Sequence, residues 1–241
     1  MRADVFLVEN GYAKSRSEAQ AAIREGLVRM DGAIVGKPSQ TVLASAAIEY
    51  VKPHPFVSRG GVKLAAGLDH FGLSPEGRVC LDLGASTGGF TQVLLQRGAA
   101  RVYAMDVGHG QMEAGLARDS RIVVRDGVNA RELTPADLPE AITAITADLS
   151  FISLKLALPP ALSLASKGAW AVLLVKPQFE VGRGAVGKGG IVRDKAAREA
   201  ATTGIAEFIA AQAGWRTLGY IESPLEGGAG NIEYLLAALK T

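Results

Sequence analysis

The order of apolar and polar positions separates a short N-terminal stretch from a longer stretch in which strands and helices alternate. From residue 79 onward, short apolar runs are followed by segments whose apolar residues recur every three or four positions. Such runs indicate buried strands, and such spacing indicates amphipathic helices. We expect strands at residues 79–83, 101–106, 122–125, 144–148, 169–176 and 215–223, helices at 90–97, 111–117, 154–166 and 195–213, and a final antiparallel strand at 231–239.

The N-terminal stretch predicts a small α+β module. An apolar segment near the N-terminus predicts a first helix, and Ser15 followed by Glu18 is a capping-box signature that predicts a second one. Two apolar runs on either side of Asp31-Gly32 predict a hairpin with a type I′ turn. Several prolines before residue 56 then mark a linker.

The alternation that follows predicts an α/β fold with a doubly wound sheet, which binds ligands at the carboxyl ends of its strands. Pro159 and Pro160 are expected to disturb the helix that covers them, because proline has no N–H group to donate. The chain has 241 residues, of which 48% are hydrophobic, enough for one such domain and a small module. We therefore expect two domains, residues 1–56 and residues 57–241.

A loop of small residues after the first strand of the larger domain carries the most specific chemical signal. The loop reads Gly84-Ala85-Ser86-Thr87-Gly88-Gly89-Phe90. Glycines let backbone N–H groups approach a ligand, and a helix N-terminus carries partial positive charge, so the loop can cradle part of a nucleotide-like molecule. Asp82 disfavours a phosphate there and favours a cationic ligand. Asp106 ends the next apolar run, 22 residues after Gly84, where an acid commonly holds a ribose diol.

Two other interpretations of this loop are open. Gly84-Ala85-Ser86-Thr87-Gly88 also matches the nucleophile elbow of serine hydrolases. That chemistry needs an acid and then a histidine, and of the three histidines only His109 follows Ser86, so we disfavour it. The loop could instead be a structural turn of an ordinary α/β domain, because glycine fingerprints alone are weak. The acid at position 106 argues against that interpretation.

Charge and cysteine content narrow the class of protein. The net charge of +2 gives no overall basic field, so any RNA-binding surface must be a local patch. The single cysteine, Cys80, lies on an apolar strand and is expected to be a buried thiol in a reducing cytoplasm. The N-terminus lacks a signal-peptide core, and the longest apolar run, 169–175, is too short to span a bilayer. We expect a cytoplasmic protein that is not bound to a membrane and uses no metal.

Four charged residues interrupt the apolar segments of the larger domain. Asp148 and Lys176 end apolar strands, Glu233 lies within the final segment, and Lys63 enters a helix ahead of the first strand. A lysine that closes a buried strand costs free energy unless it is paired or functional. A salt bridge or a snorkelling side chain would explain Lys176 without any chemistry. Pro177, however, ends the strand where ligands bind, and Asp148 is a suitable partner.

These residues carry a resemblance to a known family. The order Lys63, Asp148, Lys176, Glu233 resembles the K-D-K-E tetrad of FtsJ-like ribose 2′-O-methyltransferases, and the whole chain is similar to the TlyA family, often labelled hemolysin A. The supporting stretches are 58–64, 82–91, 106–111, 148–151, 175–180, 187–194 and 230–234. The resemblance implies a Rossmann-like class I methyltransferase sheet that uses S-adenosylmethionine to methylate cytidine ribose in ribosomal RNA. The N-terminal module is similar to an RNA-binding domain of a small-subunit ribosomal protein, and its short start favours the large-subunit RNA.

The resemblance also implies roles for residues around the cofactor. Those expected to surround its methionine part are Asp82, Gly84, Ala85, Ser86, Thr87, Gly88, Gly89 and Phe90, with Asp148 close by. Asp106, followed by Val107, would bind the ribose hydroxyls. Residues of the stretch Arg125-Asp126-Gly127-Val128-Asn129 would border the adenine, and Asp126 and Asn129 compete for that contact.

Lys176 is implied to be the base or the orienting group for the ribose 2′ hydroxyl, with Asp148 and Glu233 holding it and Lys63 completing the cluster. A methyl sulfonium is already a strong donor, so such an enzyme must align oxygen, methyl carbon and sulfur and remove one proton. Burial and Lys63 favour the neutral amine that a base requires, whereas Asp148 and Glu233 favour the ammonium ion. The sequence leaves that balance open.

Two groups of cations are candidates for RNA contact. Those of the N-terminal module are Lys14, Arg16, Arg24, Arg29 and Lys37, and those of the larger domain are Arg59, Arg183 and Lys188. The module's basic and acidic residues nearly balance, so charge alone predicts a solvated face, and the resemblance changes that expectation to RNA. The loop 182–190 nearly matches a P-loop, but Gly189 stands where Ser or Thr is required. We expect either a basic loop that orders on RNA phosphates or a plain flexible loop.

Three competing functions are weaker. A cytolysin, which the family label suggests, would need a membrane span or a long cationic amphipathic helix, and the sequence predicts neither. A protein that only binds RNA is disfavoured by the intact tetrad and glycine loop. A small-molecule methyltransferase is disfavoured by the N-terminal module. We expect ribosomal RNA or a ribosomal subunit as the partner of a monomeric enzyme.

Overall fold

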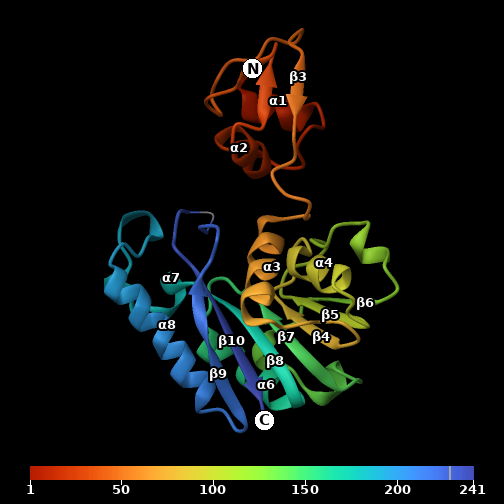
Figure 1. Ribbon diagram of the computed structural model, residues 1–241, viewed down its shortest axis with the longest axis vertical. Coiled ribbons are helices and arrows are strands. Elements are labelled where there is room, and N and C mark those ends of the chain that lie inside the picture. Colours follow the sequence, from red (N-terminus) through yellow and green to blue (C-terminus); the bar gives the residue numbers. More distant parts are fainter. Residues whose placement is uncertain (228) are drawn as a thin grey trace. The chain divides into compact units, whose positions relative to one another are not determined.

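The computed structural model describes residues 1–227 and 229–241, without the side chain of Arg183, and divides the chain into two compact units. The first unit is Met1–Pro55 and the second is Phe56–Thr241 (Figure 1). Each unit is built around a hydrophobic core of its own. Within these described ranges, no helix is both long and apolar enough to cross a bilayer.

The first unit packs two helices and a three-stranded antiparallel sheet around a small core. Its elements are α1 (Ala3–Glu9), α2 (Arg16–Arg24), β1 (Val28–Met30), β2 (Ala33–Ile34) and β3 (Ile48–Tyr50), with the strands in the order β2-β1-β3. Phe6, Leu7, Ile23 and Val28 are buried together between these elements. A core of this size stabilises a domain only marginally, so polar contacts matter more here than in a large domain.

Local chemistry sets the start of α2 and the hairpin turn, as the sequence predicts. Ser15 Oγ accepts the Glu18 N–H at 3.2 Å, which caps the helix. Asp31 and Gly32 have φ values of 50° and 80°, the two positive angles that a type I′ turn requires. The sequence pattern missed β3, because a strand of three residues is too short to display an alternating pattern.

The second unit is a seven-stranded sheet with helices on both faces. Its strands, in the order β6-β5-β4-β7-β8-β10-β9, are β6 (Ile122–Asp126), β5 (Arg101–Asp106), β4 (Val79–Leu83), β7 (Ile142–Ala147), β8 (Ala165–Val175), β10 (Tyr234–Lys240) and β9 (Trp215–Glu222). All of these strands run in one direction except β10, which is antiparallel to both β8 and β9. The chain order reverses between β4 and β7, which is where doubly wound sheets bind ligands. The predicted α/β fold with a Rossmann-like sheet is confirmed.

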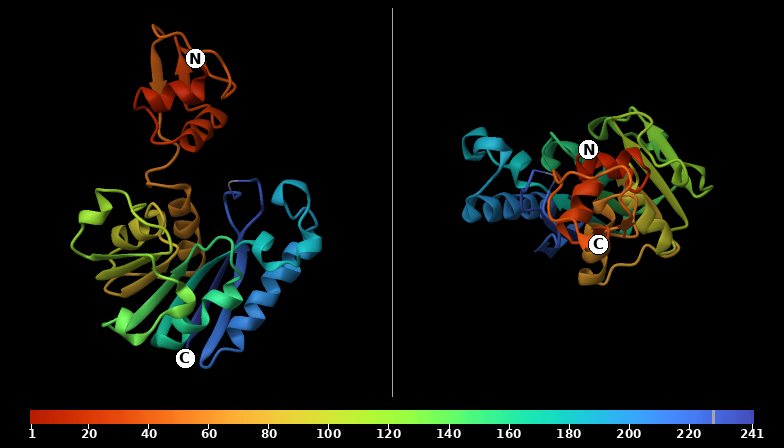
Figure 2. Two further views of the ribbon diagram at one scale, coloured as in Figure 1. Left: turned by 180° about the vertical axis from the view of Figure 1, so that it is seen from behind. Right: turned by 90° about the horizontal axis from the view of Figure 1, so that it is seen from above.

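The helices of the second unit cover the two faces of this sheet (Figures 1 and 2). They are α3 (Arg59–Phe71), α4 (Gly89–Gln96), α5 (Leu154–Ala157), α6 (Pro159–Leu164), α7 (Pro177–Glu180) and α8 (Lys195–Ala210). On one face, Leu64 of α3 and Leu94 of α4 pack with Trp170 of β8. On the other face, Leu162 and Ile205 join α6 and α8 to the sheet. The expected buried thiol, Cys80, lies within the first of these cores.

Two predicted helices differ from the structure. The helix predicted over 111–117 is wrong, since only a single 3-10 turn, Leu116–Arg118, forms there. The Glu113 side chain accepts N–H groups of residues that follow it, and the Glu113 N–H donates to Thr87 O at 3.2 Å, so this segment is held against the glycine loop. The helix predicted over 154–166 is divided at Pro159 into α5 and α6.

Candidate active site

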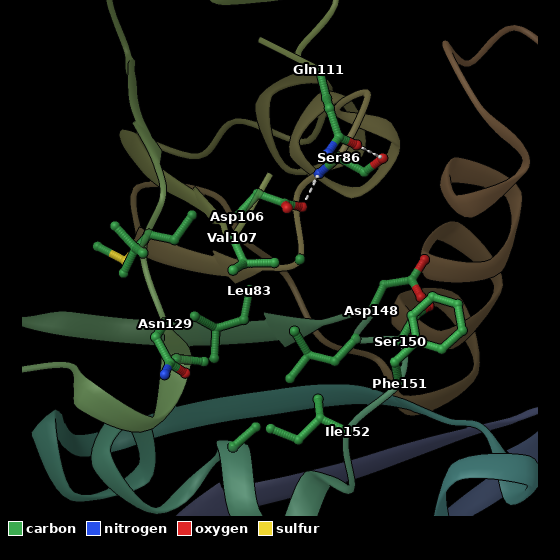
Figure 3. A pocket seen from close by; sticks show the side chains of 16 residues that line it. Leu83, Ser86, Asp106, Val107, Gln111, Asn129, Asp148, Ser150, Phe151 and Ile152 are labelled. Atoms are coloured by element: carbon green, nitrogen blue, oxygen red, sulfur yellow. Dashed lines mark hydrogen bonds between the residues drawn. The ribbon is translucent and has the colours of Figure 1, made fainter. Parts of the chain in front are cut away.

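A cavity of about 480 Å³ opens at the carboxyl ends of β4, β5 and β7 (Figure 3). A smaller recess of about 140 Å³ adjoins it, and Gly84, Ser86 and Asp148 line both. The polar side chains around the larger cavity belong to Ser86, Asp106, Gln111, Asn129, Asp148 and Ser150. The cavity lies where the strand order reverses, as the sequence predicts for a ligand site.

The glycine loop forms the wall of the recess because its backbone adopts conformations that few residues allow. Gly84 has a φ of 76°, and Ser86 has one of 46°. A Cβ atom on Gly84 would come within 2.5 Å of the Asp148 carbonyl oxygen, so only glycine lets β4 and β7 end this close together. The loop residues that line the recess are Gly84, Ala85, Ser86, Thr87, Gly89 and Phe90. Gly88, also expected to touch the cofactor, packs instead against Met112.

Asp106 is held at the cavity by backbone donors. Its Oδ2 accepts the Ser86 N–H at 2.8 Å (Figure 3). Its Oδ1 accepts the Gly108 N–H at 2.7 Å. Each carboxylate oxygen can accept a further hydrogen bond, so the group can also receive hydroxyls of a ligand. Ser86 Oγ donates to Gln111 Oε1 at 2.9 Å, which fastens the segment after β5 to the glycine loop.

Asp82 lies behind the glycine loop and is not among the residues that line the cavity or the recess. Its side chain is fully buried, and the hydroxyls of Thr91 on α4 and Thr146 on β7 donate to its two oxygens at 2.6 and 2.9 Å. Burial raises the pKa of Asp82 to about 6, because two hydroxyls replace only part of the lost hydration. The carboxyl group therefore fastens β4, β7 and α4 beneath the loop.

The side of the cavity expected to face an adenine is lined by fewer residues than predicted. Val128 and Asn129 line it, whereas Asp126 and Gly127 do not. Asp126 Oδ2 instead accepts the Gly110 N–H at 2.7 Å. Of the two residues between which the sequence left the contact open, the geometry thus favours Asn129, and the contact itself stays a prediction.

The four charged residues of the expected tetrad come together as two ion pairs. Lys63 Nζ lies 2.5 Å from Glu233 Oε2, and both side chains are buried. Lys176 Nζ lies 2.6 Å from Asp148 Oδ1, at the end of the cavity, and both side chains keep some exposure. The antiparallel register of β8 and β10, continued one step, places Lys176 opposite Glu233. The two cations and two anions thus balance, which limits the cost of removing them from water.

Comparison with known proteins assigns the chain to a family. The FtsJ-like methyltransferase model matches residues 56–240, and the S4 domain model matches residues 1–48. The 16S/23S rRNA (cytidine-2′-O)-methyltransferase TlyA of Mycobacterium tuberculosis is 47% identical over 98% of this chain and 88% of its own length. The chain belongs to the TlyA family of FtsJ-like methyltransferases.

Proteins with hemolysin names belong to the same TlyA family. Hemolysin A of Brachyspira hyodysenteriae is 40% identical to this chain over 98% of each protein. A solved structure from Streptococcus thermophilus, described as a hemolysin, matches with a TM-score of 0.80 and 38% identity over 100% of this chain and 88% of that chain. The hemolysin label therefore marks the family and indicates no separate fold.

Two residues of this TlyA-family site carry no signal that the sequence pattern reveals. Ser150 Oγ accepts a hydrogen bond from Lys176 Nζ at 2.9 Å, so a hydroxyl holds the lysine in addition to Asp148. Phe151 is 92% exposed, has a φ of 65°, and lies against Phe179 with ring centroids 5.3 Å apart. Positive φ is strained for a bulky residue, and such strain is typical of functional sites. Both residues lie in the stretch 148–151, which supported the family resemblance, but the sequence assigned no role to either of them.

The cations expected to contact RNA occur in both units. In the first unit, the exposed ones are Lys14, Arg16, Arg24, Arg29 and Lys37. Arg16 also forms an ion pair with the buried Asp4, at 3.1 Å, so part of its charge is already engaged. In the second unit, Arg59 begins α3 and Lys188 is exposed in the loop before α8. The side chain of Arg183 lies outside the described part of the structure.

Proposed function

We propose that this protein transfers a methyl group from S-adenosylmethionine to the 2′ oxygen of a cytidine in ribosomal RNA, with Lys176 as the acceptor of the hydroxyl proton. The observation that supports this most directly is the Lys176–Asp148 ion pair at the edge of a cavity walled by the glycine loop. The Mycobacterium tuberculosis relative is named for this reaction on 16S and 23S rRNA. Ribosomal RNA as the substrate also leads us to expect a cytoplasmic protein, and we expect it to act as a monomer.

The cavity fits S-adenosylmethionine in size and in chemistry. Its volume of about 480 Å³ is within the range of roughly 300–1,000 Å³ found for small-molecule sites. Asp106 would accept the ribose hydroxyls, and Val128 and Asn129 would border the adenine. The recess beside the glycine loop would hold the methionine part. When bound, the cofactor supplies an activated methyl group, and alignment and proton removal are left to the protein.

The residues around Lys176 can align and deprotonate a ribose hydroxyl. A 2′ hydroxyl is a poor nucleophile, so it must be positioned and must lose its proton as it reacts. Lys176 Nζ is held by Asp148 Oδ1 and Ser150 Oγ, which direct the amine to the end of the cavity. In the proposed step, Lys176 first releases a proton to solvent, its neutral amine then accepts the proton of the hydroxyl, and Asp148 stabilises the ammonium ion that forms again. Glu233 of the adjacent Lys63–Glu233 pair lies opposite Lys176 in the register of β8 and β10.

The first unit would bring the RNA to this site. Its match to the S4 domain and its five exposed cations support contact with RNA phosphates. Such contacts position a nucleic acid without reading its bases, so the choice of nucleotide would depend on the second unit as well. The RNA of either ribosomal subunit is therefore a candidate substrate.

Substitution of Lys176 tests the proposal. We expect Lys176→Ala to reduce methyl transfer about a thousandfold, the scale of a lost proton-transfer group, while the Kd for the cofactor changes little. Lys176→Arg should be equally inactive, because a guanidinium cannot accept the proton. Lys167→Ala is the matched control, since Lys167 is an exposed lysine near the other end of β8.

The product would be mapped as 2′-O-methylcytidine in both ribosomal RNAs, from cells with and without the gene and from purified subunits. Activity of Lys176→Arg would contradict proton transfer to Lys176 and leave it an orienting role. Loss of cofactor affinity with normal turnover at saturation would contradict both roles. A wild-type protein that methylates no cytidine would overturn the proposed reaction.

A further inference from the structure

The basic loop between α7 and α8 is joined to the segment that leads into β10, and both rise from the same end of the sheet (Figures 1 and 2). In the part of the chain that the structure describes, the side chain of Asn231 makes this join. Asn231 Oδ1 accepts the Val192 N–H at 3.0 Å, and Asn231 Nδ2 donates to Gly190 O at 2.9 Å. Asn231 is only 2% exposed, so few water molecules can replace these bonds. Loss of the side chain would leave the buried Val192 N–H without its acceptor, which is unfavourable.

The end of the loop is also held by α8, because Arg198 Nη1 donates to Val192 O at 3.1 Å and to Arg193 O at 2.7 Å. Gly189 and Gly190 have φ values of 80° and 77°, the left-handed region that glycine enters without strain. Gly187 N–H donates to Ile191 O at 3.0 Å, which closes the turn on itself but does not join it to the sheet. Lys188 stands exposed within this turn. Asn231 therefore joins the turn to the segment before β10, and Arg198 joins the residues after the turn to α8.

Asn231 is also part of the backbone that holds Glu233. Its carbonyl oxygen accepts the Gly227 N–H at 2.8 Å, and the Ser223 N–H donates to Glu233 O at 2.8 Å. A Cβ atom on Gly227 would collide with Glu233 Oε1, so this segment is packed directly against the carboxylate. Glu233 in turn pairs with Lys63. A shift of Asn231 would thus move the carboxylate that lies beside Lys176.

We propose that Asn231 is a positioning residue that couples the basic loop to the Lys63–Glu233 pair, so that the loop's engagement with RNA sets the geometry around Lys176. This inference rests on the proposed methyl transfer for its kinetic measurement. The ion pair needs a defined geometry because both charges are buried, and a misplaced carboxylate would leave Lys63 uncompensated. RNA phosphates would meet the loop through Lys188, and Asn231 would carry the restraint to Glu233.

Asn231→Ala in the full-length protein tests the coupling with three measurements. They are the rate of trypsin cleavage after Lys188, the Kd for S-adenosylmethionine, and kcat and KM on ribosomal RNA. We expect cleavage to become about tenfold faster and kcat to fall about tenfold, the scale of a buried hydrogen-bond pair. The cofactor Kd should stay within about twofold, since the cavity is lined by other residues. kcat is calculated per molecule that binds the cofactor, which removes any effect of unfolded protein.

Thr202→Ala is the matched control. Thr202 is a buried polar residue of α8 whose hydroxyl donates to Arg198 O at 2.9 Å, so its loss costs stability without touching the loop or Glu233. This variant should leave both the cleavage rate and kcat unchanged. Asn231→Asp has the same shape as asparagine and keeps the acceptor for Val192, but it turns an oxygen toward Gly190 O. Asn231→Asp should give the same faster cleavage and lower kcat as Asn231→Ala. It takes the place of Asn231→Ala if the alanine variant does not fold.

Two results would overturn the inference. Unchanged cleavage in both variants would mean that Asn231 does not hold the loop. Faster cleavage with normal kcat would mean that the loop is held but is not coupled to Glu233. Inactivity of the wild-type protein would instead count against the proposed reaction, and the cleavage and cofactor measurements would still be readable in that case.

Discussion

Among the residues that the structure describes, each unit buries one aspartate, and the surroundings of the two are opposite in character. Asp4 in the first unit accepts hydrogen bonds from Arg2, Arg16 and Gln20. The hydrogen bond from Arg2 is the main cause that holds the pKa of Asp4 far below its usual range. Asp82 in the second unit accepts hydrogen bonds from two threonine hydroxyls, and burial raises its pKa to about 6. Burial alone therefore does not determine the pKa of a carboxyl group, because the charge of its hydrogen-bond donors changes the direction of the shift.

The different partners of Asp4 and Asp82 correspond to the different sizes of the hydrophobic cores in the two units. In the first, Asp4 on α1 bonds to Arg16 and Gln20 on α2, so charge joins two helices over a small core. In the second, a large core already holds β4 and β7 together, and neutral hydroxyls suffice for Asp82. The effects on stability have opposite signs. The contribution of Asp4 is present above the unfolded pKa and is lost as pH falls, whereas that of Asp82 is present below the unfolded pKa and is lost as pH rises through about 6.

Removal of Asp4 should have the largest effect. Asp4→Ala takes the shared acceptor away from Arg2, Arg16 and Gln20, and we expect a loss of roughly 3 kcal/mol, a large share of the stability of so small a unit. Hydrogen exchange followed by mass spectrometry should show α1 and α2 exchanging rapidly, while the second unit keeps its protection and its affinity for the cofactor. Persistent protection of α1 would show that the apolar core alone holds the first unit.

Asp82→Asn should have a smaller effect of the opposite sign. The amide has the shape of the carboxyl group but carries no charge, so the variant should be more stable than the wild type at pH 7.5 by about 2 kcal/mol. The difference should shrink as pH falls from about 6 and disappear near pH 4, where the wild-type group is protonated in both states. Urea unfolding of the second unit across this pH range measures it. Asp69→Asn is the control, because Arg97 lowers the pKa of Asp69 and the dependence on pH should reverse. A wild type more stable than Asp82→Asn at pH 7.5 would contradict the assigned cost of burial.

The two aspartates also show how far the sequence can predict a site. Lys176 and Asp106 were predictable because a charge that ends an apolar run lies at the ligand-binding edge of a parallel sheet. Asp82 looked equally favourable, but which side of the glycine loop its side chain faces depends on Thr91 and Thr146, and Thr146 is distant in sequence. The pairing within the tetrad could not be predicted either, since it depends on the register between β8 and β10.

The remaining failures have the same physical cause. Ser150 and Asn231 act through hydrogen bonds to residues far along the chain, and no periodicity reports such bonds. The helix predicted over 111–117 had a suitable apolar pattern, but Glu113 bonds to the glycine loop and prevents it. Local pattern therefore predicted the elements and the strand ends, whereas long-range polar contacts determined which side chains meet.

The smallest expected effect on stability concerns Arg16, which belongs both to the Asp4 cluster and to the cations expected to contact RNA. Its side chain is 60% exposed, so Arg16→Gln should cost less than about 1 kcal/mol, as is usual for exposed ion pairs. Asp4 would keep its hydrogen bonds from Arg2 and Gln20.

If Arg16 also contacts a phosphate, the Arg16→Gln variant should bind a ribosomal RNA fragment more weakly, and the slope of log K against log salt should decrease by about 0.9. Arg24→Gln is the matched control, because Arg24 lies on the same helix. In the described part of the chain, the side chain of Arg24 has one hydrogen bond, to Gln20 Oε1 at 3.4 Å. A large loss of stability with an unchanged salt slope would mean that Arg16 binds Asp4 and not RNA. The positive charge of Arg16 would then stabilise the first unit and would not contribute to RNA recognition.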